Sequence, residues 1–214
     1  MKLEWIVPPK IIKRIFSNYC WNVPSEDNSV YLTFDDGPIS EVTPWVLAEL
    51  EKFEAKATFF CIGENIQKHP DVFRQVIEAG HAVGNHTFHH LNGWNTTIRK
   101  YVENAQQCQN IIAEHYKPNT VNGKLFRPPY GKIRPRQSIS LHKKDYKIIM
   151  WSVLSADYDV TLSKEKCLEN VIKNVQPGSI IVFHDSLKAF PRLEYALPKA
   201  LEYLKEKGFK FKRL

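Results

Sequence analysis

The chain has 214 residues, of which 43% are hydrophobic and 25% are charged, and its formal net charge is +7. This length and apolar content suffice for one globular domain with a sizeable core, and no apolar run approaches the roughly 20 residues of a membrane span. Basic residues are spread along the chain without a nucleic-acid-binding motif. We therefore expect neither a transmembrane protein nor a nucleic-acid partner.

Residues 1–28 precede the regular pattern of the chain, and we expect them to form an N-terminal extension that packs on a catalytic domain over residues 29–214. The segment 6–16 is apolar and basic, and it predicts a short amphipathic helix from Pro9. It lacks the continuous apolar stretch and small-residue cleavage site of a signal peptide. A cytoplasmic location, or a peripheral one on a membrane surface, is therefore expected. The sequence does not specify the oligomeric state.

Strands and helices alternate along the rest of the chain. Apolar runs predict strands over 30–34, 58–61, 82–84, 125–126, 147–151, 179–183 and 209–211. Helices are predicted between them, over 43–53, 71–79, 95–116, 135–144, 163–174 and 193–207. The first begins with Thr43 as its cap and Pro44 at its first position, and Gly80 and Gly208 stop two others. Such alternation predicts an α/β fold with a parallel sheet and right-handed crossovers.

The most informative segment is 33–38, which reads Thr-Phe-Asp-Asp-Gly-Pro. Asp35 and Asp36 stand at the end of a predicted strand, directly before a Gly-Pro breaker. Two adjacent carboxylates are unfavourable unless a positive charge lies near them, and divalent cations favour carboxylate oxygen. This segment by itself is equally consistent with a solvated turn.

Three histidines within five residues supply further candidate ligands. His86, His89 and His90 follow a Gly-rich approach. A helical turn over 86–90 would bring His86 onto one face with His90, and an offset of three residues would do the same for His89. Two imidazoles and one carboxylate bind a metal ion and leave positions open for water and substrate. The spacing does not decide between His89 and His90.

Two later segments add a cation and a candidate acid. Arg127 begins the sequence Arg-Pro-Pro-Tyr-Gly over 127–131, in which proline fixes the backbone and could hold one N–H rigidly as an oxyanion donor. An ordinary proline turn is the alternative for this segment. His184 ends the apolar run 179–183, which is typical of a strand covered on both faces. Its place at the strand end suits general acid catalysis.

Taken together, these segments resemble the motifs of the polysaccharide deacetylase family, the carbohydrate esterases with a NodB-homology domain. The resemblance runs from about Val30 to the C-terminus, and the family motif His-Ser/Thr-x-x-His selects His90 over His89. Two motifs depart from the family pattern: Tyr158 stands where Trp is usual, and Val182 stands where Leu is usual. The resemblance implies a single-domain, distorted and incomplete (β/α) barrel. It also implies a metal-dependent hydrolase that removes acetyl groups, most often N-acetyl, from a carbohydrate or glycoconjugate and releases acetate.

The resemblance assigns a metal site and a substrate pocket to residues of this chain. The metal ligands would be Asp36, His86 and His90. The metal would be Zn²⁺ by default, and the same ligands accept Co²⁺, Ni²⁺ or Fe²⁺. The pocket for the acetyl group would be lined by Pro128, Trp151, Tyr158 and Val182.

The resemblance also assigns the catalytic roles. Asp35 would be the general base and His184 the general acid. The backbone N–H of Tyr130 would hold the oxyanion. Arg127 would orient Asp35, and Asp157 would pair with Arg127.

Other classes of function fit parts of the same pattern. The ligand set is also that of non-haem iron oxygenases, although their usual jelly-roll barrel does not match the helix-rich alternation of this chain. A non-catalytic glycan-binding module of the same fold would bind glycan without releasing acetate. A deacylase of a small non-sugar amide would use the same residues. Within the deacetylases, the sequence does not choose the acetylated substrate, nor between N- and O-deacetylation.

Overall fold

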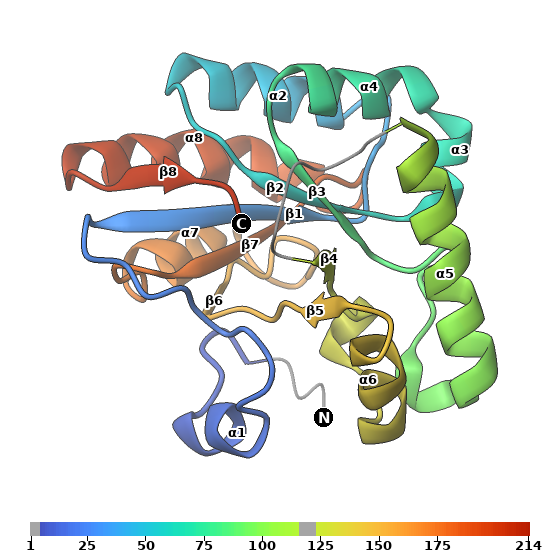
Figure 1. Cartoon of the computed structure of the whole chain (residues 1–214). Coiled ribbons are helices and arrows are strands. Elements are labelled where there is room, and N and C mark those ends of the chain that lie inside the picture. The colour runs from blue at the N-terminus through green and yellow to red at the C-terminus, as the bar shows by residue number, and fades with distance from the viewer. Residues whose placement is uncertain (1–4, 116–122) are drawn as a thin grey trace.

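The structure is a computed structural model that describes residues 5–115 and 123–214. Within this part of the chain, eight strands form one sheet in the order β5-β4-β3-β2-β1-β7-β6, with β8 beside β1 (Figure 1). The strands are β1 Ser29–Asp35, β2 Thr58–Cys61, β3 Ala82–Asn85, β4 Lys124–Phe126, β5 Tyr146–Ile148, β6 Val153–Leu154, β7 Ile180–His184 and β8 Lys210–Lys212. Neighbouring strands pair in parallel, so their C-terminal ends meet at one edge. The expected parallel, incomplete barrel is confirmed.

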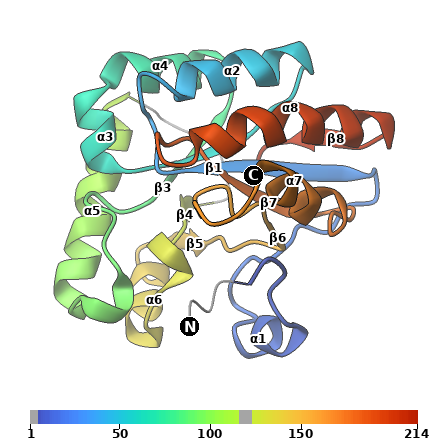
Figure 2. The same ribbon diagram turned by 180° about the vertical axis from the view of Figure 1, so that it is seen from behind.

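Helices cover the outside of the curled sheet. They are α1 Lys10–Ile15, α2 Thr43–Lys52, α3 Gly63–Lys68, α4 Pro70–Glu78, α5 Ile98–His115, α6 Pro135–His142, α7 Lys164–Ile172 and α8 Phe190–Glu206. Two 3₁₀ turns, η1 Gly93–Asn95 and η2 Pro129–Gly131, lie in the connections. In Figure 1, α2, α3 and α4 lie above the sheet, α5 stands at one end, and α1 and α6 lie below. The opposite view shows α7 and α8 on the near side (Figure 2).

Strand alternation places apolar side chains on one face of β1 and polar side chains on the other. Phe34 stacks on Phe59 of β2, with ring centroids 5.0 Å apart, and on Phe183 of β7 at 6.1 Å. These rings belong to the main core beneath α2, α4, α7 and α8. Thr33 and Asp35 consequently face the inside of the curl, where both meet the same buried side chain, Arg127.

The helix and strand predictions differ from the structure in a few places. The strand expected over 147–151 corresponds to the shorter β5, and neither the strand β6 nor the helix α3 was predicted. Both missed elements are too short for a periodic apolar pattern. Thr43 is not a cap: its hydroxyl accepts a hydrogen bond from the Ile39 N–H at 2.8 Å and donates to Asp185. Residue 116 of the helix expected over 95–116 lies outside the described residues.

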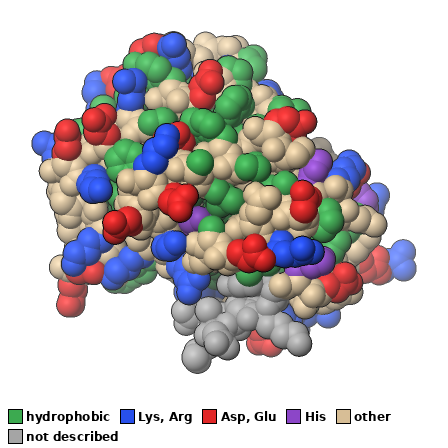
Figure 3. All heavy atoms as spheres, turned by 90° about the horizontal axis from the view of Figure 1, so that it is seen from above, with side chains coloured by type: hydrophobic (Ala, Val, Ile, Leu, Met, Phe, Trp, Pro, Cys, Tyr) green, Lys and Arg blue, Asp and Glu red, His purple; other side chains and the backbone are tan. Residues whose placement is uncertain are grey.

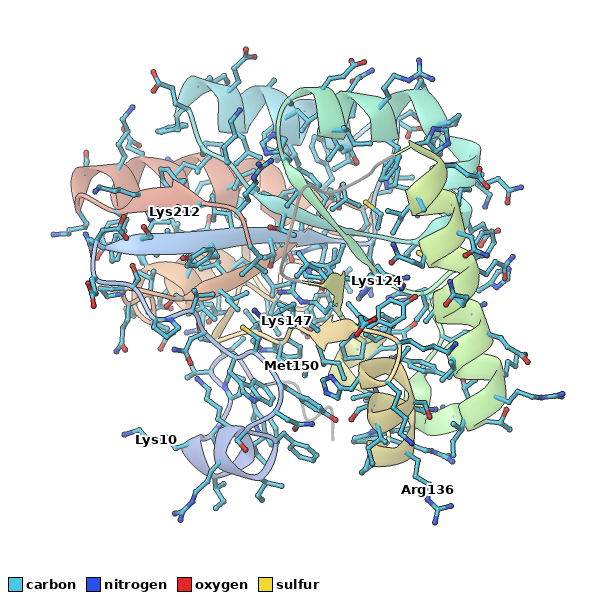
Figure 4. The ribbon with its side chains drawn as sticks, viewed as in Figure 1. Lys10, Lys124, Arg136, Lys147, Met150 and Lys212 are labelled. Atoms are coloured by element: carbon cyan, nitrogen blue, oxygen red, sulfur yellow. The ribbon has the colours of Figure 1, made fainter. Side chains whose placement is uncertain are left out.

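The described part of the N-terminal segment packs on the sheet. Cys20 and Asn22 form isolated bridges with Ile149 and Ser179. In α1, Ile12 packs against a buried cluster, whereas Ile11 is exposed and Lys10 points away from the body of the protein (Figure 4). The division of the chain after residue 28 stays a prediction.

The outer surface carries charges of both signs. Acidic and basic side chains are mixed over the face seen from above, which includes α2 and α4 (Figure 3). Among the described residues, no helix is long and apolar enough to cross a membrane.

Candidate active site

A cavity of about 340 Å³ opens at the C-terminal ends of the central strands. It collects side chains at or just after the ends of β1, β3, β4, β6 and β7, which are far apart in sequence and lie in one sheet. Its lining consists of Asp35, Asp36, His86, His90, Pro128, Tyr130, Gly131, Trp151, Leu154, Tyr158, Val182, His184, Ser186 and Lys188. The segments singled out in the sequence therefore share one cavity, at the edge where barrel enzymes place their sites.

Asp36, His86 and His90 converge beside this cavity. Each offers one ligand atom, and the three atoms lie within 4.8 Å of one another. Asp36 Oδ1 lies 3.8 Å from His86 Nε2 and 3.2 Å from His90 Nε2. The first distance is too long for a hydrogen bond, and among the described residues no donor is found for Asp36 Oδ1, which is a buried acceptor. Such an orphaned oxygen between two imidazole nitrogens fits a site for a cation.

The two imidazoles reach Asp36 from an irregular loop. The helical turn considered for 86–90 is wrong: these residues follow β3 as bends, with Thr87 at φ 62° and His90 at φ 52°. His86 Nδ1 donates to the Arg127 carbonyl at 2.8 Å, which turns Nε2 toward Asp36. His89 is turned away, because its Nδ1 accepts from the Asn104 amide at 2.8 Å. The choice of His90 over His89 thus agrees with the grouping of ligand atoms.

Electrostatics favour the protonation states that bind metal. Burial lowers the pKa of His86 to about 4, so the ring is neutral near pH 7. Burial alone would raise the pKa of Asp36, but the close approach and charge of His90 and the charges of His184 and His86 outweigh it and hold this pKa well below its usual range. A neutral imidazole and an ionised carboxylate are the ligand forms that divalent cations require. The donor set, the orphaned oxygen and the fixed His86 ring fit a divalent cation.

Arg127 lies inside the curled sheet and forms an ion pair with Asp35. The guanidinium is 1% exposed, and its Nη1 donates to Asp35 Oδ1 at 2.7 Å and to Thr33 Oγ1 at 2.7 Å. Nη2 donates to the Met150 carbonyl at 2.9 Å, just beyond β5 (Figure 4). The guanidinium carbon also lies 4.1 Å from the centre of the Phe60 ring. These contacts fix one oxygen of Asp35 and keep the carboxylate paired in a buried position.

Asp157 pairs with His184, so the expected pairing of Asp157 with Arg127 is wrong. Asp157 Oδ1 accepts from His184 Nδ1 at 2.7 Å, and Oδ2 accepts from the His184 backbone N–H at 2.9 Å. The physical reason is topological: β6 and β7 are neighbours, and this brings residue 157 beside the end of β7. Burial would lower the pKa of His184, but the charge and hydrogen bond of Asp157, with Asp36 and Asp35, raise it to about 9. His184 is therefore a cation at neutral pH and can donate a proton.

The loop 127–131 borders the cavity through Pro128, Tyr130 and Gly131. Tyr130 has φ 59°, and the flanking N–H groups of Gly131 and Lys132 bond back to the carbonyls of Pro128 and Pro129. Among the described residues, no acceptor is found for the Tyr130 N–H. The Tyr130 ring lies 4.5 Å from the His90 ring, which places this loop beside the metal-ligand group. A free N–H here is available to an oxygen of a bound substrate.

The four residues expected to line the acetyl pocket all line the cavity. Val182 packs with Leu154 and Ala156, and the Tyr158 ring lies 4.8 Å from the His184 ring in an edge-on arrangement. Trp151 is fixed by its indole N–H, which donates to the Trp5 carbonyl at 3.0 Å. Leu154, Ser186 and Lys188 also line the cavity and were not expected. No motif marks them, although Ser186 and Lys188 lie only two and four residues after His184 in the sequence.

Asp185 is a buried carboxyl group that holds the turn after β1 without lining the cavity. Its Oδ1 accepts from the Gly37 N–H at 3.0 Å and its Oδ2 from the Thr43 hydroxyl at 2.7 Å. Its own N–H donates to the Asp35 carbonyl at 3.1 Å. These bonds tie the end of β7 to the turn that carries both aspartates. Burial raises the pKa of Asp185 to about 8.

Comparisons with known proteins agree with the site. The sequence model of the family described as polysaccharide deacetylase matches residues 22–149. The chain is 33% identical over 192 residues to a peptidoglycan-N-acetylglucosamine deacetylase of Bacillus cereus, with 89% of this chain and 88% of the relative covered. It is 34% identical over 167 residues to a chitooligosaccharide deacetylase of Azorhizobium caulinodans, with 76% of each covered.

A solved structure shows the same fold. A peptidoglycan N-acetylglucosamine deacetylase, in complex with 4-naphthalen-1-yl-N-oxidanyl-benzamide, superimposes with a TM-score of 0.87 at 32% identity. The match covers 97% of this chain and 95% of that one. The family model ends at residue 149, before β6 and β7, whereas the structural match extends over nearly the whole chain.

Proposed function

We propose a mechanism and a substrate class from one premise: the chain belongs to the polysaccharide deacetylase family. It is a carbohydrate deacetylase that hydrolyses acetyl groups and releases acetate. The substrate class that we assign to it is an oligomer or polymer of N-acetylhexosamine, because the relatives named above are deacetylases of peptidoglycan N-acetylglucosamine and of chitooligosaccharide. The observation that carries the assignment is the meeting of one candidate cation site, one Arg-held carboxylate and one cationic histidine in a single cavity.

The family is metal-dependent, and we assign the metal to Asp36, His86 and His90, with Zn²⁺ as the expected ion. When bound, such a cation supplies Lewis acidity, which polarises the acetyl carbonyl and acidifies water. Asp35 stands next to this group without belonging to it, since Arg127 occupies one of its oxygens at 2.7 Å. Asp35 therefore acts as the general base and accepts the proton of the attacking water.

The Tyr130 N–H and His184 act on the two substrate atoms whose charge changes, the acetyl oxygen and the sugar nitrogen. As water adds to the acetyl carbon, the carbonyl oxygen becomes negative, and the Tyr130 N–H donates a hydrogen bond to it. A single donor of this kind is worth about 3 kcal/mol. His184, held cationic by Asp157, donates its Nε2 proton to the departing sugar nitrogen. Acetate and a free amine result, and no bond between the protein and the acetyl group is required.

The apolar wall selects the acyl group. Val182, Leu154 and Trp151 border the cavity with apolar groups, which suit a methyl group better than a charged acyl chain. Val in place of the usual Leu removes one methylene and slightly enlarges this space. Tyr158 keeps an aromatic wall beside His184. These departures alter pocket shape while each assigned chemical role keeps its residue.

The assignment is tested by acetate release from N-acetylglucosamine oligomers and from O-acetylated xylan. Wild-type protein and Asp35→Asn are compared as purified, after chelation, and after add-back of Zn²⁺, Co²⁺, Ni²⁺ or Fe²⁺. We expect chelation to stop release from the N-acetyl substrate, add-back to restore it, and Asp35→Asn to stay inactive with every metal. Release that survives chelation would exclude the metal assignment. Glycan binding without release in the wild type would favour a non-catalytic module.

A further inference from the structure

An exposed aromatic pair stands beside the catalytic cavity. Trp94 on η1 is 54% exposed and Tyr130 on η2 is 49% exposed, which is unusual for side chains of this size. The Lys132 ammonium lies 5.4 Å from the centre of the Trp94 ring and 5.9 Å from that of the Tyr130 ring. Because the same ammonium lies near both rings, the Trp94 and Tyr130 rings are neighbours. Their centres are separated by no more than about the length of a disaccharide.

The backbone under Trp94 is firmly held. The Asn92 side chain accepts from the Trp94 N–H at 3.0 Å, and the Gly93 N–H donates to the Lys132 carbonyl at 3.1 Å. Gln137 of α6 is fully buried, and its amide donates to the Gly93 carbonyl at 2.9 Å. A Cβ on Gly93 would lie 2.4 Å from the Lys132 carbonyl oxygen, so only glycine allows the two turns to approach so closely. The exposed indole is therefore held by a rigid support rather than by a loose loop.

This surface continues the catalytic cavity. Tyr130 belongs to both: its ring lies 4.5 Å from His90, and its other neighbour is the Lys132 ammonium that reaches Trp94. A glycan whose acetylated unit occupies the cavity would extend past Tyr130 toward Trp94 in one of its two directions. Pyranose rings carry an apolar face of C–H groups, which packs on aromatic rings, and hydroxyl groups at their edges, which accept hydrogen bonds from an ammonium.

We propose that Trp94, Lys132 and the outer face of Tyr130 form a binding subsite for a pyranose unit of the glycan, beyond the unit that loses its acetyl group. This subsite rests on the proposed function. The Trp94 ring supplies the stacking surface, and Lys132 donates to the hydroxyl groups of the stacked sugar. It makes the enzyme favour longer oligomers over short ones.

The test compares the β-1,4-linked pentamer and dimer of N-acetylglucosamine, because the pentamer covers the subsite and the dimer can bind without it. We expect Trp94→Ala to lower the ratio of kcat/KM for pentamer over dimer roughly five- to tenfold, mainly through the KM of the pentamer. Trp94→Phe keeps a stacking ring and should retain most of the ratio. Ile15→Ala, which removes another exposed apolar side chain, on α1, should leave the ratio at its wild-type value.

A pentamer-to-dimer ratio that stays the same in Trp94→Ala, in protein whose thermal unfolding is unchanged, would overturn the subsite. If the wild type releases no acetate from either oligomer, the proposed function fails, and the subsite is then judged by calorimetric binding of the pentamer. Weaker pentamer binding by Trp94→Ala than by the wild type would support it, and equal binding would refute it.

Discussion

Replacing Asp157 with Asn should move the basic limb of the pH dependence of kcat/KM to lower pH. Asp157 is fully buried, and each of its oxygens accepts a bond from His184, one from the ring and one from the backbone. Asn keeps the volume and one acceptor oxygen but removes the negative charge. The backbone contact can persist, so the change is confined mainly to the charge that the imidazole senses. We therefore expect the protein to fold and His184 to lose its proton more easily.

The size of the shift follows from the pKa of His184. This pKa is raised from 6.5 to about 9, with Asp157 as the largest of the groups that raise it. At about 1.4 kcal/mol per pKa unit, the total is roughly 3 kcal/mol. Without the Asp157 charge, burial still lowers this pKa while Asp36 and Asp35 still raise it, so we take the ordinary histidine value of 6.5 for the variant. At pH 8 the protonated fraction then falls from about nine-tenths to about three-hundredths, which predicts a roughly 30-fold loss in kcat/KM.

The direction of the pH dependence distinguishes the loss of the His184 proton from a general loss of active-site structure. A histidine is active as an acid below its pKa, so wild-type activity is lost as pH rises through about 9 and variant activity as it rises through about 6.5. A bound divalent cation adds positive charge near His184, so both limbs lie at or below these values. At pH 6 about three-quarters of His184 in the variant is still protonated, so the loss should be less than twofold. The assay is acetate release from an N-acetylglucosamine oligomer between pH 5 and 10.

Tyr158→Phe is the matched control, because it keeps the ring beside His184 and removes no charge. Its basic limb should stay where the wild type has it. An unchanged basic limb in Asp157→Asn would refute the idea that Asp157 sets the charge of His184. A loss of equal size at every pH would mean that Asp157 only positions the ring.

Two further predictions concern the metal and the buried cation. Asp36→Ala removes the orphaned oxygen between the two imidazoles, so elemental analysis of the purified variant should find no metal above background. Asp35→Asn should keep its metal. Metal loss in Asp35→Asn would make Asp35 a ligand. Arg127→Leu should lower the free energy of unfolding by about 3–5 kcal/mol in chemical denaturation, because it leaves the buried Asp35 carboxylate unpaired. A loss below about 1 kcal/mol would show that Asp35 finds another partner.

The layout of the fold could be predicted from local patterns. Buried strands such as β2 are continuous apolar runs, and the helices between them carry stop signals such as Gly80 and Gly208. Parallel pairing then follows, because each crossover contains a helix. It also follows that residues at the C-terminal ends of strands meet, which is why Asp36, His86 and His184 could be placed in one site before any distance was known.

The partners of individual side chains could not be predicted in the same way. Asp157 follows the short strand β6, which the sequence does not reveal, and only its pairing with β7 puts the carboxylate on His184. The loop after β3 reaches Asp36 through residues with positive φ rather than through a helical turn. Such contacts depend on register and loop conformation, which leave no periodic trace in the sequence.

Asp185 shows how far the site extends past its motifs. It touches neither the ligand group nor the cavity, yet its two oxygens hold Gly37 and Thr43, and its N–H holds the Asp35 carbonyl. Gly37 cannot carry a side chain there, since a Cβ would lie 1.9 Å from Asp185 Oδ2. The direction in which Asp35 and Asp36 leave β1 is therefore set by a carboxyl group on β7. Two neighbouring aspartates can take separate roles because this clamp keeps one turned to Arg127 and the other to the imidazoles.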